Sequence, residues 1–118
     1  MNDIDFIKKC CEYADGFRII GGDIVIPSGD YITNTEKHYQ WPNLIYPLLL
    51  QRAIEGVNNG CVAQIIQADE EIESLTTKGF RFKTFRHAEH KSIDATKRAV
   101  LEYVFEQESK DVPIRREK

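Results

Sequence analysis

The pattern of apolar residues is most regular between Trp41 and Asn58, where it follows the spacing of a helix. The residues that share the apolar face are Ile45, Tyr46, Leu49, Leu50, Ala53, Ile54 and Val57. A stripe this wide is typical of a helix that packs against a sheet. Pro47 lacks an N–H and its ring clashes with the carbonyl four residues earlier, so we expect a start near Asn43 with a distorted first turn. The run Asn58-Asn59-Gly60 tolerates the left-handed conformation and predicts the end of the helix.

Two further helices are predicted, one at each end of the chain. Asn2 or Asp3 caps the first, whose acidic start suits the positive end of the helix dipole, and Gly16 ends it. Ser92 or Asp94 caps the last helix, which turns a second apolar stripe inward. From Ser109 onward the mixed charges predict a flexible tail over 109–118.

Between the helices, β-branched and aromatic residues mark the strands. Phe17–Ile26, broken by Gly21-Gly22-Asp23, predicts a hairpin. Pro27–Gln40 is expected to be a long loop with a short extended piece at Tyr31 and Ile32. Three more strands are predicted, at Val62–Gln67, Ile72–Thr76 and Phe80–Phe85.

These elements give the order α-β-β-α-β-β-β-α. We therefore expect one α+β domain over residues 1–108, a sandwich of a mostly antiparallel sheet with packed helices.

Composition narrows the functional classes. The 118 residues carry a net charge of −3, which offers no overall field to attract nucleic acid or anionic lipid. No apolar run approaches the roughly 20 residues of a membrane span, and the acidic N-terminus does not resemble a secretory signal.

The chain has three cysteines, Cys10, Cys11 and Cys61, an odd number that does not suit a disulfide framework. We expect a cytoplasmic protein in which Cys11 lies in the core and Cys10 is incidental.

The string from Lys78 to Phe85 resembles the aromatic octapeptide of the RNA-recognition motif family. Lys78, Gly79, Phe80, Phe82 and Phe85 match the pattern, whereas Arg81 and Lys83 depart from it. The resemblance implies that Phe80 and Phe82 stack on unpaired bases, with Lys78, Arg81 and Lys83 beside them. The element order and the negative charge of the chain disagree with that family. The alternative is a half-buried strand whose phenylalanines belong to the core.

Histidines offer the remaining candidates for chemistry. His87 and His90 could hold a metal together with Glu89, but the spacing fits no helical zinc site. The segment is predicted to be a loop, so exposed loop histidines are the preferred interpretation. His38 has the residue type for acid-base work, without a partner fixed by the sequence. We therefore assign no catalytic residue, no metal ligand and no cofactor.

The segment from Trp41 to Asn58 resembles a segment of small uncharacterised proteins from bacteriophages and prophages of Gram-positive bacteria. This resemblance implies an origin in a bacterial host cell and no particular activity. Trp41, beside His38 and Tyr39, either staples the loop to the core or serves as a binding anchor. We expect a non-enzymatic accessory protein that binds an unknown protein partner or a second copy of itself. Single-stranded nucleic-acid binding is the alternative.

Overall fold

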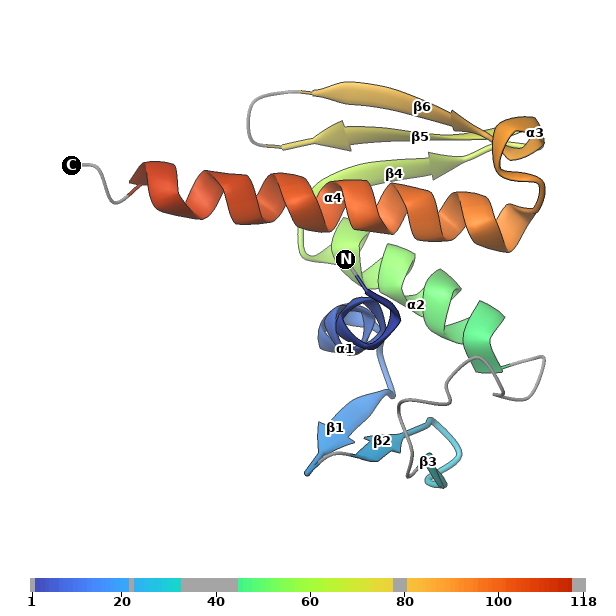
Figure 1. Cartoon of the computed structure of the whole chain (residues 1–118), viewed down its shortest axis with the longest axis vertical. Helices are drawn as coiled ribbons and strands as arrows, with labels where there is room; N and C mark the ends of the chain where they lie inside the picture. Colours follow the sequence, from blue (N-terminus) through green and yellow to red (C-terminus); the bar gives the residue numbers. More distant parts are fainter. Residues whose placement is uncertain (1, 22, 33–44, 78–80, 116–118) are drawn as a thin grey trace. The chain divides into compact units, whose positions relative to one another are not determined.

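A computed structural model describes residues 2–21, 23–32, 45–77 and 81–115, and describes side chains in these ranges apart from Ile32 and 109–115. The chain divides into two compact units, residues 1–56 and residues 57–118, and each is described by itself. Figure 1 shows the elements in chain order.

The first unit begins with helix α1 (Asp3–Tyr13). Asn2 caps it, since its side-chain oxygen accepts a hydrogen bond from the Asp5 N–H at 2.8 Å, as the sequence predicts. Cys10 and Cys11 are both buried. The expectation for Cys11 is confirmed. The expectation that Cys10 is incidental is wrong, because Cys10 shares the buried face of α1 with Phe6.

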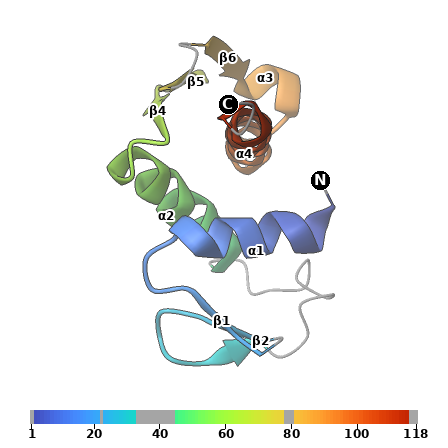
Figure 2. The ribbon, with the colours of Figure 1, turned by 90° about the vertical axis from the view of Figure 1, so that its left-hand side faces the viewer.

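Three short strands follow α1 and form an antiparallel sheet in the order β1-β2-β3. They are β1 (Arg18–Ile20), β2 (Asp23–Val25) and β3 (Tyr31–Ile32). Both the predicted hairpin and the short extended piece are confirmed. The ribbons of β1 and β2 can be followed in Figure 2.

Helix α2 (Ile45–Asn59) confirms the strongest sequence pattern. Pro47 is close to the first described residue of this helix, and the predicted start near Asn43 lies outside the described residues. The helix also approaches α1 very closely: a Cβ added at Gly56 would lie 1.9 Å from the carbonyl oxygen of Tyr13. Glycine at this position therefore lets the backbones of α1 and α2 come together. The residues of α2 up to Gly56 belong to the first unit.

The last residues of α2, from Val57 onward, belong to the second unit, and the helix ends in a Schellman motif. The N–H of Cys61 bonds the carbonyl of Asn58 at 3.1 Å, and the N–H of Val62 bonds that of Val57 at 3.1 Å. Cys61 therefore occupies the position that glycine usually takes, and its φ of 59° is left-handed. It is exposed, unlike the other two cysteines.

The second unit is a three-stranded antiparallel sheet with a long helix on one face. The strands are β4 (Ala63–Gln67), β5 (Glu71–Thr76) and β6 (Phe82–Arg86), in that spatial order. The short helix α3 (His87–His90) leads into α4 (Ile93–Arg115). Figure 1 shows α4 running along the sheet, and Figure 2 shows it end-on beneath β5 and β6. Ser92 caps the start of this helix, because its hydroxyl accepts a hydrogen bond from the Ala95 N–H at 3.0 Å.

The core of this unit lies between the sheet and α4. The sheet residues buried there are Ala63, Ile65, Ile72, Ser74, Thr76 and Phe85, and α4 contributes Val100 and Val104 among others. The hydroxyl of Ser74 is fully buried without a hydrogen-bond partner among the described residues.

The α+β fold and the antiparallel pairing are confirmed. The structure adds β3 and α3 to the predicted order, and the strands form two separate sheets where one was expected. Helix α4 also continues to Arg115, into the segment expected to be a tail. Over the described ranges, none of the helices combines the length and the apolar character that crossing a bilayer requires.

Candidate functional site

The register of the β4-β5-β6 sheet determines which side chains of β6 face the helix. Phe85 pairs with Ile72 and Lys83 pairs with Ser74, both buried partners. Successive side chains of a strand point to opposite faces, so Phe82 must point to the other side. Its side chain is 61% exposed, whereas Phe85 is 5% exposed.

The face of the sheet opposite α4, here called the outer face, combines apolar and charged side chains. By register it consists of Gln64, Ile66, Glu71, Glu73, Leu75, Phe82, Thr84 and Arg86. Phe82 pairs with Leu75 across β5 and β6, and Leu75 pairs with Gln64 of β4. Ile66 is 51% exposed. Two large hydrophobic side chains are thus exposed on one small sheet.

The charges on the outer face are mostly acidic. Glu71 and Glu73 lie on its central strand, and the single basic residue among its members, Arg86, is 3.9 Å from a carboxylate oxygen of Glu71. Two carboxylates in the middle of a face repel a phosphate backbone, because nucleic-acid affinity depends chiefly on cationic contacts to phosphates. The outer face is better suited to a protein surface than to nucleic acid.

The described members of the octapeptide do not share a face. Phe82 is on the outer face, whereas the ammonium of Lys83 lies on the helix side, 5.2 Å from the ring centroid of Phe85 and 5.0 Å from that of Tyr103. Arg81 donates a hydrogen bond to the side-chain oxygen of Gln107 on α4. The two cations therefore lie away from the ring that would stack on a base. Lys78 and Phe80 fall outside the described residues.

The predicted interaction residues His38, Tyr39 and Trp41 also fall outside the described residues. They stay a prediction. Sequence reasoning overlooked Ile66 and Leu75, although one signal was available: Phe82 and Phe85 are an odd number of residues apart, so only one of them can face the core.

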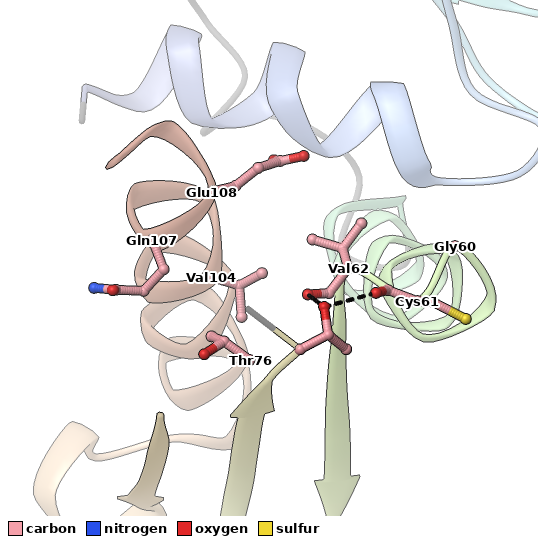
Figure 3. A pocket seen from close by; sticks show the side chains of 8 residues that line it. Gly60, Cys61, Val62, Thr76, Val104, Gln107 and Glu108 are labelled. Atoms are coloured by element: carbon pink, nitrogen blue, oxygen red, sulfur yellow. Dashed lines mark hydrogen bonds between the residues drawn. The ribbon is translucent and has the colours of Figure 1, made fainter. Parts of the chain in front are cut away.

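A cavity of about 240 Å³ opens in the second unit, between the end of α2, the β5 terminus and α4 (Figure 3). Its two threonine hydroxyls are already engaged. Thr77 Oγ1 donates toward the carbonyls of Cys61 and Val62, at 3.0 and 3.1 Å, and Thr76 Oγ1 accepts from the Arg81 N–H at 3.1 Å. The sulfur of Cys61 points away from the other lining side chains in Figure 3. The described lining therefore contains no nucleophile beside a base.

The two histidines of α3 have different surroundings. The hydroxyl proton of Thr96 is donated to the Ser92 carbonyl at 2.8 Å, so Thr96 Oγ1 must accept from His87 Nδ1 at 2.9 Å. In the neutral ring this leaves a lone pair on Nε2 of His87. The ring of His90 lies 6.2 Å from that of Phe85. Among the described residues no group of three or more metal-binding side chains comes together, so a metal at His87 and His90 has no support in the geometry.

The thiol of Cys11 is buried in α1, and its pKa bears on whether it can react. Burial, reinforced by the charge of Glu12, raises the pKa of Cys11 to about 12. A thiol that stays protonated at neutral pH is a poor nucleophile. Cys11 thus serves packing.

Comparison with known proteins adds no assignment. No protein-family model matches the chain, no curated protein sequence is significantly similar to it, and no solved structure matches its fold at a significant level.

Proposed function

We propose that this chain is a non-enzymatic protein-interaction domain whose binding surface is the outer face of the β4-β5-β6 sheet. The exposure of Phe82 is the observation that carries the proposal. Burying a phenylalanine that is more than half exposed contributes on the order of 1 to 2 kcal/mol, and aromatic residues are preferred anchors at protein interfaces. Leu75 beside it and Ile66 on β4 extend the apolar area.

The resemblance of residues 41–58 to small phage and prophage proteins supports an accessory role in the cytoplasm of a bacterial host. The segment that contains His38, Tyr39 and Trp41 is a second place where a partner could bind. It is proposed on sequence alone.

Single-stranded nucleic-acid binding is the second candidate, and the same exposed ring favours it. A stacked base needs a face such as that of Phe82, but it also needs cations beside it. The carboxylates of Glu71 and Glu73 occupy the neighbouring central strand instead. We therefore rank this activity below protein binding.

The test compares three tagged chains: wild type, Phe82→Lys and a matched control, Ile20→Lys. Ile20 is 46% exposed on β1, outside the proposed surface, so the control makes a similar change elsewhere. Each tagged chain is mixed with untagged chain and with host lysate, and retained proteins are identified by mass spectrometry. We expect one retained protein, a host protein or the untagged chain, to be lost with Phe82→Lys and kept with Ile20→Lys.

Equal retention by all three chains would refute the outer face as the binding surface. Fluorescence anisotropy with a labelled single-stranded oligonucleotide separates the alternative. If the wild-type chain bound the oligonucleotide and Phe82→Ala abolished that binding, nucleic acid would replace protein as the partner.

A further inference from the structure

The two edges of the β4-β5-β6 sheet differ in how their backbone groups are satisfied. On β4, the residues whose N–H and C=O point away from β5 include Ile65, because Ala68 and Glu71 form a hydrogen-bonded pair and the pairs alternate from there. The side chain of Asn58 takes both groups of Ile65: its oxygen accepts from the Ile65 N–H at 2.7 Å and its amide donates to the Ile65 carbonyl at 3.1 Å. The middle of the β4 edge is therefore occupied from within the chain.

The β6 edge has no such cover among the described residues. The N–H of Thr76 bonds the carbonyl of Arg81 at 2.9 Å, and the N–H of His87 bonds that of Glu70 at 3.0 Å. These two contacts fix the alternation of hydrogen-bonded pairs along β5 and β6. The N–H and C=O groups of Phe82, Thr84 and Arg86 consequently point away from β5. In the described sheet, no strand lies on that side of β6.

Charged side chains commonly protect a sheet edge, but the two on β6 are engaged elsewhere. The ammonium of Lys83 lies over the rings of Phe85 and Tyr103 on the helix side. The guanidinium of Arg86 lies 3.9 Å from Glu71 on the neighbouring strand. Neither proline nor glycine interrupts β6. The usual devices against edge pairing are thus weak here.

We propose that β6 pairs antiparallel with β6 of a second copy of this chain about a twofold axis at Thr84, which joins the two sheets into one. Resting on the proposed function, this names the second copy as the partner and places the contact at the β6 margin of the outer face, where Phe82 lies. A twofold axis at Thr84 sets Thr84 opposite its own counterpart and Phe82 opposite Arg86 of the second copy. The three β6 residues whose N–H and C=O groups point away from β5 then lie opposite those of the second copy. Each opposed pair can exchange two backbone hydrogen bonds.

The side chains suit this register. On the outer face, the guanidinium of Arg86 can lie over the exposed ring of Phe82 in the second copy, a favourable cation–π arrangement. Two threonines meet at the axis, and such pairs stabilise neighbouring strands. On the helix side, Lys83 lies opposite Phe85 of the second copy, so no like charges face each other directly.

The experiment uses two proline variants of the full chain. Thr84→Pro removes an N–H that points away from β5, so it costs the chain no hydrogen bond within its own sheet. Gln67→Pro is the matched control, because Gln67 also lies on an edge strand with its N–H directed away from β5. We expect the wild type and Gln67→Pro to sediment at concentrations from micromolar to millimolar with twice the 13.7 kDa chain mass, and Thr84→Pro as a single chain.

A cross-link supplies a second measurement that does not depend on the proline. In a Cys61→Ser background, Thr84→Cys places two thiols across the axis, with Cα atoms about 5.5 Å apart, within disulfide range. Mild oxidation should give a covalent dimer with Thr84→Cys and none with Gln67→Cys.

Three results would overturn the proposal: a wild-type chain that is monomeric at every concentration, a dimer that Thr84→Pro leaves intact while Thr84→Cys does not cross-link, or equal cross-linking at both positions. If the wild-type chain were monomeric but retained a host protein that Phe82→Lys does not retain, the proposed function would hold with that host protein as the partner. A dimer that Phe82→Lys and Thr84→Pro leave intact and Thr84→Cys does not cross-link, together with equal retention of every host protein by the three tagged chains, would refute both.

Discussion

Replacing Gly56 by alanine has two opposing effects on stability, a gain in helix propensity and a loss of packing. The structure predicts that the loss of packing is larger. Alanine is favoured over glycine within a helix by about 1 kcal/mol, so propensity alone predicts that Gly56→Ala stabilises the protein. The added methyl, however, would lie 1.9 Å from the Tyr13 carbonyl oxygen and 2.7 Å from its carbon. A carbon and a carbonyl oxygen normally approach to about 3.3 Å, so α1 and α2 would have to separate by roughly 1.4 Å.

Separating the two helices would also disturb the packing around the point where Gly56 meets Tyr13. The atoms that block the methyl belong to the backbone and cannot rotate away as a side chain would. Overpacking of a core costs about 1 to 3 kcal/mol, and sites that cannot relax fall at the upper end. We therefore expect Gly56→Ala to lower the free energy of unfolding by about 2 kcal/mol after the propensity gain is included.

Urea denaturation followed by circular dichroism measures this change as a shift of the midpoint at constant slope. Glu55→Ala is the control, since it makes an alanine at the neighbouring, exposed position of the same helix. The control should remain within about 0.5 kcal/mol of the wild type. A Gly56→Ala variant as stable as the wild type, or more stable, would show that the two backbones are not in close contact.

Three further predictions concern the cysteines and the buried hydroxyl. Cys61→Gly should raise the free energy of unfolding by about 0.5 to 1 kcal/mol, because it relieves a left-handed φ of 59°, whereas Cys61→Ala should not; equal stability in urea would contradict this. Ser74→Ala should leave stability unchanged or raise it by about 1 kcal/mol, since it removes a buried hydroxyl that has no described partner, and a loss above that size would reveal a hidden hydrogen bond. Burial holds the pKa of Cys11 at about 12, so the unfolded thiol ionises first and the free energy of unfolding should fall as the pH rises from about 9 towards 12; Cys11→Ala should reduce that decline, and an unchanged decline would refute it.

Local patterns were sufficient for most of the secondary structure. The Asn2 cap, the hairpin and the stripe of α2 each depend on residues close in sequence, and all three are confirmed. The separation into two sheets was not predictable in this way, because strand pairing between distant segments leaves no local signature. The burial of Cys10 is not predictable from local sequence for a related reason: the face of α1 that is buried depends on what packs against it.

The candidate surface shows the same limit within a single strand. Three phenylalanines between residues 80 and 85 predict either a stacking platform or a core strand. The structure divides them, since Phe85 is buried and Phe82 is exposed on the opposite face. Strand parity could have predicted that division.

The alternation of side chains along a strand could not have predicted which edge of the sheet has unpaired backbone groups. That depends on Asn58, which belongs to a helix by sequence yet takes the place of a neighbouring strand at Ile65. Because the Asn58 side chain covers the β4 edge, removing it should promote association through β4. Blocking the β6 edge should instead reduce association of the chain. The availability of β6 is therefore a property of the whole sheet rather than of its own five residues.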